Sequence, residues 1–276
     1  MCACASVRAY ARLCADVDDT IVVYAGGWAD GRLPNATASS SVWSSTDGAT
    51  WECVTTAAPW DPREAAAGVV FKGEMWIMGG TRQYYYSNNS HDLRNDVWHS
   101  KDGKEWVQAT PSAQWSPRAY HNAVVLGDSI YVFGGGNYQT SGEYGKAHKG
   151  GFVVNDVWKS TDGVHWTQCV EHAPWAGRIW QGAVVFRGEM WIMGGTVDTR
   201  TPPVPGAEPV WANTNDVWHS ADGIHWVQDT SPGIWTPRHA FGVYTWRDAI
   251  WMAAGNDWNN RTDGILNELW KLHPNE

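Results

Sequence analysis

Several common sequence features are missing from this chain of 276 residues. It has no apolar run of the roughly 18 residues that a membrane-spanning helix needs. It also has no run of Lys and Arg, and its net charge of −9 argues against a nucleic-acid-binding surface. The first eight residues lack the apolar core of a signal peptide. No segment keeps a helical hydrophobic period. We therefore expect no membrane contact, no nucleic-acid partner and no long helices.

Cysteine is scarce and irregularly placed. The five cysteines are Cys2, Cys4, Cys14, Cys53 and Cys169. They show neither the paired spacing of a metal site nor a following His/Cys motif, so we expect no metal and no cofactor. Their odd number favours free thiols in a reducing, cytoplasmic compartment. Glycosylation-type sequences at Asn35, Asn88 and Asn260 keep secretion open, although such matches also arise by chance in polar loops.

Tryptophan, by contrast, is unusually common, with 21 residues against 5 phenylalanines. Much of it belongs to a repeated sequence, Asn-Asp-Val-Trp followed by Ser-x-Asp-Gly-x-x-Trp. Three nearly identical copies begin at Asn95, Asn155 and Asn215, a weaker copy spans 42–51, and a shortened one spans 267–271. The first Trp of each copy recurs every 52 to 60 residues, at Trp43, Trp98, Trp158, Trp218 and Trp270. Internal repetition at this period predicts a repeat architecture.

Each repeat unit is predicted to contain four short strands, a to d. Strand a is expected at 67–71, 123–126, 183–186 and 242–246, and strand b at 20–24, 75–78, 130–133, 190–193 and 250–252. Strand c carries Asp-Val-Trp, and strand d follows the Asp-Gly turn. Strands a and b are apolar on both faces, which indicates packing on both sides. Evenly spaced units of four short strands are typical of a β-propeller.

The order of an Arg, an apolar strand, Gly-Gly, Asn-Asp-Val-Trp and a later Trp resembles the kelch repeat, from about Arg8 to Leu272. The resemblance implies an all-β, kelch-type β-propeller of about five four-stranded blades. We expect a single domain over 1–276, with units at roughly 8–56, 57–111, 112–171, 172–231 and 232–276.

The Ser-x-Asp-Gly-x-x-Trp turn resembles a shortened Asp-box, which implies structure rather than activity. Its Asp is expected to accept backbone N–H groups, and its Gly to supply a positive φ. Its Trp is expected to fill the gap between blades. Asp102, Asp162 and Asp222 occupy the Asp position in the three clearest copies.

Strand d appears in only four copies. No fifth Asp-Gly-x-x-Trp follows Leu269–Leu272, and residues 1–7 do not resemble the missing strand. Three alternatives remain: a three-stranded last blade, an atypical outer strand from the N-terminal residues, or a chain cut from a larger propeller. Five blades is the favoured interpretation.

One face of the propeller is predicted to carry the variable loops. The a–b and c–d turns are tight, whereas the b–c connections are long, at roughly 28–41, 81–95, 136–155, 196–215 and 256–267. Binding residues concentrate in long loops on a rigid scaffold. Aromatic residues in these connections, among them Tyr85 and Trp211, suit stacking on sugars or anchoring a peptide.

The d–a segments contribute a repeated Trp-x-x-Arg to the same face. The tryptophans are Trp60, Trp115, Trp175 and Trp235, and the arginines are Arg63, Arg118, Arg178 and Arg238. One interpretation is a pocket in which Arg grips a carboxylate and Trp stacks on the ligand. The favoured alternative is architectural, with each Arg tying its blade to neighbouring loop carbonyls, because the pair occurs in every unit.

Residues that differ between units are more informative about function. Around the expected channel mouth, the positions just after each Arg carry a non-repeating polar and aromatic set: Glu64, Tyr120, His121, Trp180, Gln181 and His239. We interpret this set as a candidate ligand site. Channel-lining residues bridged by water are an equally weighted alternative.

No spacing in the chain singles out a catalytic set, so whether it is an enzyme stays open. The favoured hypothesis is a monomeric, non-catalytic recognition module that binds a protein loop or a glycan. The alternative is a carbohydrate-active enzyme of the sialic-acid-processing type, in which the arginines hold a substrate carboxylate. Both hypotheses rest on analogy between folds.

Overall fold

A computed structural model of the chain describes residues 15–17, 20–24, 38–82, 92–137, 152–200, 210–230, 235–257 and 264–272. These residues form β-strands joined by turns and loops, and no helix among them is long and apolar enough to cross a membrane. The chain divides into two compact units. The first comprises Met1–Ala119, Asn137–Gly151 and Ser160–Trp166, and the second comprises Tyr120–Gly136, Phe152–Lys159 and Thr167–Glu276.

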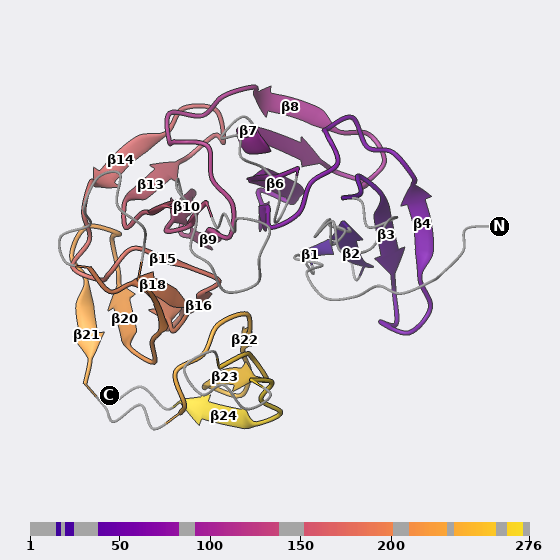
Figure 1. Ribbon diagram of the computed structural model, residues 1–276. Coiled ribbons are helices and arrows are strands. Elements are labelled where there is room, and N and C mark those ends of the chain that lie inside the picture. Colours follow the sequence, from indigo (N-terminus) through magenta and orange to yellow (C-terminus); the bar gives the residue numbers. More distant parts are fainter. Residues whose placement is uncertain are drawn as a thin grey trace. The chain divides into compact units, whose positions relative to one another are not determined.

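Five antiparallel sheets follow the sequence repeat (Figure 1). The first contains β1 (Ala15–Val17), β2 (Thr20–Tyr24), β3 (Val42–Ser45) and β4 (Glu52–Thr55). The second contains β5 (Ala67–Phe71), β6 (Glu74–Thr81), β7 (Leu93–Ser100) and β8 (Val107–Thr110). The third contains β9 (Asn122–Leu126), β10 (Ser129–Phe133), β13 (Val157–Ser160) and β14 (Thr167–Val170). The fourth contains β16 (Gly182–Phe186), β17 (Glu189–Met193), β20 (Val217–Ser220) and β21 (Val227–Asp229). The fifth contains β22 (Gly242–Thr245), β23 (Ile250–Ala253) and β24 (Leu269–Leu272).

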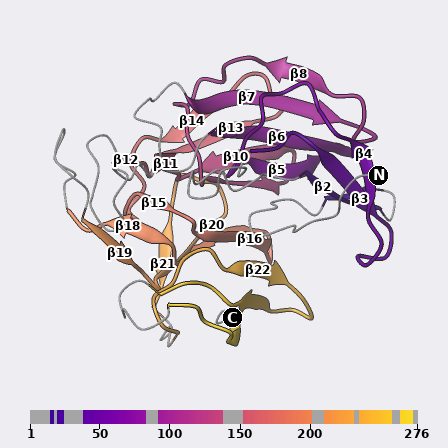
Figure 2. The ribbon, with the colours of Figure 1, turned by 45° about the vertical axis from the view of Figure 1, so that its right-hand side comes forward.

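The predicted a and b strands are confirmed, since each overlaps an observed strand. The first strand of the first repeat, which the sequence pattern does not predict, is β1. Two small sheets also form within segments predicted only as long loops or links. One pairs β11 (Gly136–Asn137) with β12 (Phe152–Val153), and the other contains β15 (Arg178–Ile179), β18 (Thr196–Asp198) and β19 (Trp211–Asn213), which lie side by side in Figure 2.

The b strand β17 contributes to two cores at once, which explains why it is apolar on both faces. On β17, Met190 and Ile192 join a cluster with Phe133 of β10. The alternate residues Trp191 and Met193 join another cluster with residues of β23. Successive side chains of a strand point to opposite faces, so one strand bridges two sheets. Within the second unit, the third, fourth and fifth sheets therefore pack in succession.

The Asn-Asp-Val-Trp repeat has a structural role for each residue. In the third sheet, the Asn155 side-chain amide donates to the carbonyls of Ala173 and Trp175, at 2.9 and 3.1 Å, and so holds the d–a segment. Asp156 accepts the indole N–H of Trp158 at 2.7 Å, and Val157 is fully buried. The second sheet repeats the amide bonds from Asn95. The repeat is therefore explained by the scaffold.

Four c–d hairpins have the turn geometry that the sequence predicts. In each, one aspartate oxygen accepts the backbone N–H groups two and three residues further on, at 2.7–2.9 Å. The preceding serine hydroxyl accepts the glycine N–H at 2.8–2.9 Å. The four glycines have φ between 71° and 77°, which L side chains rarely adopt. Asp and Gly are thus both required by the backbone.

Candidate functional site

The repeated arginines of the d–a segments are buried and already hold carboxylates of the chain itself. Arg63 forms two parallel bonds to Asp96, at 2.5 and 2.9 Å, and Arg178 forms two to Asp216, both at 2.8 Å. Arg238 bonds Glu268 at 2.5 Å. A bidentate arginine–carboxylate pair fills the edge of the guanidinium that would otherwise grip a ligand.

Each of these arginines also bonds backbone carbonyls. Arg178 donates to Ala176 and to Gly194, at 3.1 and 3.0 Å, and Arg238 makes the same contacts to Thr236 and Ala254. Arg118 is fully buried and bonds both the carbonyl and the hydroxyl of Ser116. These contacts match the architectural alternative for the repeated arginines.

Electrostatics in these pairs favour the charged form of the carboxylate. Burial alone would raise the pKa of Asp216, but the hydrogen bonds and positive charge of Arg178 outweigh it and hold the pKa below its ordinary value. The hydrogen bond from Arg238 likewise lowers the pKa of Glu268. Both pairs are therefore ionised at neutral pH.

The tryptophans of the d–a segments lie in the interior. Trp115, Trp175 and Trp235 are no more than 5% exposed. Trp175 meets the hairpin Trp226 edge-to-face, with ring centroids 5.7 Å apart. Trp115 meets Trp166 in the same way, at 6.0 Å. This geometry is favourable for aromatic pairs and leaves little ring surface for a ligand.

The backbone two residues after each arginine is left-handed. The φ values are 55° at Ala65, 60° at Tyr120, 55° at Trp180 and 54° at Ala240. Non-glycine residues seldom adopt this region, so the surroundings must enforce it. In the second compact unit, the Trp180 N–H donates to the Tyr120 carbonyl at 3.4 Å, and the Ala240 N–H donates to the Trp180 carbonyl at 3.1 Å. Backbone hydrogen bonds therefore link three successive sequence repeats.

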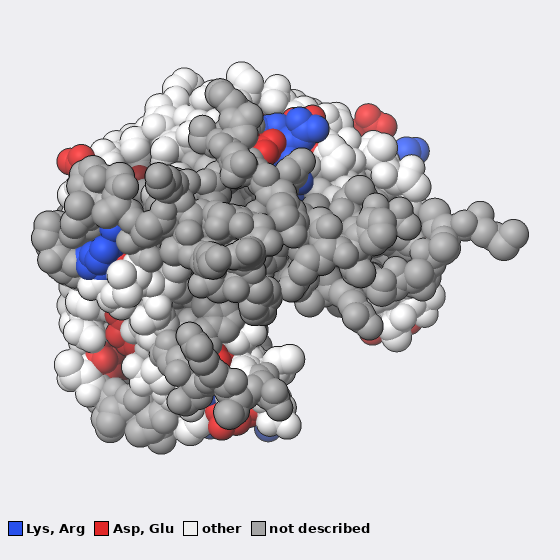
Figure 3. Space-filling view, viewed as in Figure 1, with Lys and Arg blue, Asp and Glu red and all other residues white. Residues whose placement is uncertain are grey.

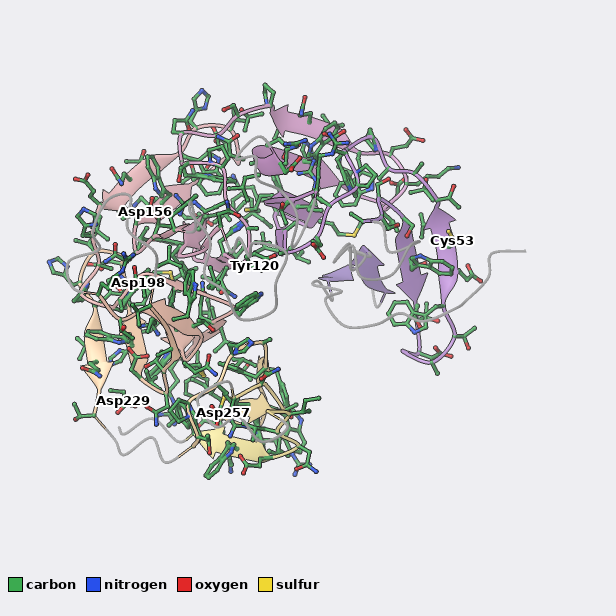
Figure 4. All side chains as sticks on the ribbon, viewed as in Figure 1. Cys53, Tyr120, Asp156, Asp198, Asp229 and Asp257 are labelled. Carbon is green, nitrogen blue, oxygen red and sulfur yellow. The ribbon has the colours of Figure 1, made fainter. Side chains whose placement is uncertain are left out.

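Three of the non-repeating residues, Tyr120, Trp180 and His239, form one aromatic cluster in which the rings are tilted against one another, at 60° and 33°. The Trp180 ring lies 4.9 Å from the ring of Tyr120, which Figure 4 labels, and 5.0 Å from the ring of His239. All three residues are buried, with exposed fractions of 2–4%. Side chains from three different repeats thus meet at one place.

His239 is tied to the b–c connection of the fourth sheet through Asn213. The Asn213 amide nitrogen donates to the Asn256 carbonyl at 3.1 Å, so its oxygen faces His239 Nδ1 at 2.9 Å. The same oxygen accepts the Thr196 hydroxyl at 2.9 Å. Because the amide oxygen can only accept, His239 carries its proton on Nδ1. Burial lowers the pKa of His239 from 6.5 to about 3, so the ring is neutral at physiological pH.

The remaining members of the set are also buried. Gln181 and His121 are fully buried, and both stand three residues after a repeated arginine. Two other repeats carry Ala66 and Phe241 at this position. A Cβ on Gly134 would lie 2.7 Å from the Gln181 amide nitrogen, so the glycine makes room for this side chain. Glu64 belongs to the first unit, where its backbone pairs with Thr81 at 2.8 and 2.9 Å.

Several aromatic residues of the predicted binding loops lie outside the residues that the structure describes. Tyr85, and the other loop aromatics Tyr84, Tyr86, Tyr138, Tyr144 and Trp258, fall outside the described residues. Sequence reasoning in turn missed Asn213, Thr196 and Asn256, which connect His239 to the loops. Their signal was weak, because each is a single polar residue beside a repeated motif. In the sequence, these residues stand out only when the repeats are compared position by position around each Gly-Gly pair.

The described residues offer no metal centre, since no group of three or more His, Cys, Asp and Glu among them could hold an ion. Cys53 on β4, labelled in Figure 4, and Cys169 on β14 both lie on the outer strands of their sheets. Burial raises the pKa of the Cys169 thiol, which keeps it protonated.

On the face drawn in Figure 3, the described Lys and Arg side chains form small separate groups.

Replacing His239 by glutamine is expected to reduce the acid sensitivity of the fold. As the pH falls below about 6.5, the unfolded chain protonates this histidine while the native site does not, so native stability is lost. The loss approaches about 1.4 kcal/mol per pH unit and ends near pH 3. Urea unfolding of wild type and H239Q at a series of pH values measures the difference in slope. The control is H172Q, because His172 is exposed and its ring bonds the uncharged side chain of Asn155. An unchanged slope in H239Q would contradict the prediction.

No family model matches the chain. Leucine-zipper-like transcriptional regulator 1 homolog of Drosophila melanogaster is 27% identical over 176 residues, which cover 61% of this chain and 16% of that protein. Kelch domain-containing protein 3 of Homo sapiens is 24% identical over 156 residues, or 56% of this chain and 37% of that protein. The matches thus span only a minor part of both relatives.

A solved structure, that of YjhT, is similar over 91% of this chain and 77% of its own, with a TM-score of 0.61 and 16% sequence identity. At this identity the likeness concerns the fold alone. It agrees with the succession of small antiparallel sheets described above.

Proposed function

Because the chain is a kelch-type β-propeller with kelch-like relatives, we propose that it is a recognition module that binds a loop of another protein. The contact surface consists of the b–c connections and the d–a segments. Within the second compact unit, the non-repeating residues Tyr120, His121, Trp180, Gln181 and His239 form the base of this surface, whereas Glu64 belongs to the first compact unit.

The observation that carries the proposal is the ordered b–c connection of the fourth sheet. Instead of a plain loop it forms β18 and β19, which pair with each other and with β15. Asp198 closes this hairpin by accepting the Val210 N–H at 3.1 Å and by pairing with Arg200. Asn213 fixes its base to His239 and Thr196. Strands β18 and β19, held in this way, present their own side chains without a large loss of entropy on binding.

The chemistry of this surface suits a partner with apolar and uncharged hydrogen-bonding groups. The base is aromatic, and its histidine is neutral because of burial. Trp211, at the start of β19, is partly exposed. Aromatic residues backed by a rigid scaffold are the side chains that dominate protein–protein contacts.

The sialic-acid-processing enzyme ranks second. It needs a guanidinium edge turned toward a substrate carboxylate. Arg63, Arg178 and Arg238 would first have to release Asp96, Asp216 and Glu268. Separating a buried ion pair costs several kcal/mol, which a substrate would have to supply.

Truncating Trp211 to alanine is expected to weaken partner binding by about tenfold or more, because an aromatic anchor is lost. Wild type and W211A are immobilised and exposed to an extract of the source cells, and retained proteins are compared by mass spectrometry. The matched control is I224A on a c–d hairpin, since Ile224 is 49% exposed but belongs to the opposite loops. Circular dichroism checks that both variants are folded.

A partner retained by wild type and I224A but lost by W211A supports the proposal. The same three proteins are then applied to a glycan array. If no protein shows this pattern but a glycan on the array does, the ligand of this surface is a glycan and not a protein. A partner lost equally from W211A and I224A, or retained by both, contradicts the proposed surface.

A further inference from the structure

Two equivalent slots lie between successive sheets of the second compact unit. One wall of each slot is the first residue of a strand a, Asn122 on β9 or Gly182 on β16, which pairs with the last residue of the adjoining strand b. The other wall belongs to the next repeat and stands three residues after its arginine, as Gln181 or Phe241. The chain therefore contains the same slot twice, with different side chains in it.

The slot between the fourth and fifth sheets, formed by Gly182 and Phe241, is apolar. A Cβ on Gly182 would lie 2.6 Å from the Phe241 ring and 2.6 Å from the Val243 side chain, so the two sheets are in close contact here. The same ring lies against Gly194, where a Cβ would be 2.9 Å away. Phe241 belongs to the hydrophobic cluster of these two sheets. The fold therefore does not require a polar side chain in this slot.

The slot between the third and fourth sheets, formed by Asn122 and Gln181, carries two polar side chains instead. The Gln181 amide nitrogen lies against Gly134, where a Cβ would be 2.7 Å away. Asn122 precedes Val124 by two residues on β9, and Val124 packs in the cluster shared with the fourth sheet. Because alternate residues of a strand point to the same face, Asn122 also faces the fourth sheet. Its side chain therefore shares the slot with Gln181.

Three polar atoms in this slot have no hydrogen-bond partner among the described residues. They are Oε1 and Nε2 of Gln181 and Oδ1 of Asn122, and all three are buried. Gln181 as a whole is fully buried. Buried polar groups in native proteins are nearly always hydrogen-bonded, because an unpaired group has lost its bonds to water without replacement. The slot is therefore expected to hold a guest that bonds these atoms.

We propose that ordered water occupies this slot and bridges Gln181 to Asn122. One water molecule accepts from Nε2 of Gln181 and donates to Oδ1 of Asn122. Oε1 of Gln181 accepts from the same molecule or from an adjacent one. A water molecule both donates and accepts, and buried water typically makes about three hydrogen bonds, which matches the three atoms of the slot.

The surroundings of the slot favour water over an ion. The neighbouring side chains of the shared cluster, among them Val124, Phe133 and Ala183, are apolar and supply no charge to balance an ion. Two carbonyl oxygens are also too few for Ca²⁺ or Mg²⁺, which take six or more oxygen ligands. The full burial of Gln181 favours a small guest.

The proposed water site lies next to the aromatic cluster but is independent of partner binding. Gln181 directly follows Trp180, and Asn122 comes two residues after Tyr120. Because Gln181 is fully buried, it contributes to the candidate site by holding water and not by touching a partner. A partner that binds the loops tests the proposed function alone, so the two proposals can fail separately.

NMR of the full chain labelled with ¹⁵N tests for the bound water directly. The Gln181 side-chain amide protons are expected to show a cross-peak to water whose sign is opposite in the laboratory-frame and rotating-frame Overhauser spectra, which marks water that tumbles with the protein. The exposed Gln228 amide is the matched control and should show no such cross-peak. The variant Y120F should keep the cross-peak, which excludes relay through the exchanging Tyr120 hydroxyl.

A double-mutant cycle tests the bridge. Urea unfolding is measured for N122A, Q181M and N122A/Q181M, where methionine roughly conserves the volume of glutamine. Either single variant loses the shared water, so the double variant should be more stable than the sum of the two losses predicts. We expect the unfolding equilibrium constant to depart from additivity by about threefold or more. The combination of N122A with Q228M, on an outer strand, should be additive.

Three results overturn the proposal. They are the absence of the water cross-peak from a resolved Gln181 amide, its loss in Y120F, and additive losses in the N122A/Q181M cycle. Through-bond spectra of the wild type assign the Gln181 amide, so the cross-peak decides the outcome by itself if Q181M does not fold.

Discussion

Replacement of Arg178 by alanine is expected to lower the free energy of unfolding by about 3–5 kcal/mol. Arg178 is fully buried, and its guanidinium bonds four acceptors: two oxygens of Asp216 and the carbonyls of Ala176 and Gly194. The variant leaves a mostly buried carboxylate without its counter-charge. Urea unfolding followed by tryptophan fluorescence measures the loss.

The effect of R178A is expected to depend on pH. Arg178 holds the pKa of Asp216 below its ordinary value, so the stabilisation is complete above about pH 4 and is lost as the pH falls through the native pKa. Without the arginine, burial raises that pKa instead. The free-energy gap between wild type and R178A should therefore narrow in acid.

The chain provides a matched control for this ion pair. Arg187 and Asp248 pair with similar geometry, at 2.7 Å, but their side chains are 42% and 71% exposed. Exposed pairs contribute at most about 1 kcal/mol, so R187A should have little effect. Equal losses in R178A and R187A would show that burial does not decide the strength of the pair.

Substitution of Trp175 by alanine is expected to cost about 3–5 kcal/mol, chiefly through the cavity that it leaves. Trp175 is 1% exposed and packs in a cluster with Phe133, Ile192 and Trp226. Its indole N–H has no hydrogen-bond partner among the described residues, so the loss is one of packing. The backbone carbonyl that accepts the Asn155 amide is kept in the variant.

Thermal and urea unfolding of W175A and W175F, with W246A as the control, test this expectation. Trp246 is 51% exposed, so its removal opens no interior cavity. W175F should lie between wild type and W175A, because phenylalanine fills part of the space. A loss in W175A no larger than that in W246A would mean that the d–a tryptophans are not core residues.

The fold could be predicted largely because its strands repeat. Met190–Met193 is apolar at every position and contributes to two cores, as expected of a strand packed on both sides. β1 escaped prediction because Ala15–Val17 is three residues long and carries an aspartate. β18 and β19 escaped prediction because the side chains that hold them contact residues far along the chain. Asp198 contacts Val210, 12 residues away, and Asn213 contacts Thr196, His239 and Asn256, which are 17, 26 and 43 residues away.

The candidate site was predictable only in part. Tyr120 and Trp180 lie two residues after a repeated arginine and His239 lies one residue after the next, and the three rings are in contact. The neutral state of His239 could not be predicted, because it results from burial by residues of other units. Nor could the sequence reveal that Arg63 and Arg178 are saturated by Asp96 and Asp216, because their opposite charges carry no spacing rule.

The left-handed residue two positions after each arginine has a consequence for engineering. The chain keeps φ at 54–60° whether the residue is Ala65, Tyr120, Trp180 or Ala240. Side-chain identity and backbone conformation are therefore decoupled at these positions. New side chains could therefore be introduced at these positions, one in each of four repeats, while the backbone conformation is retained.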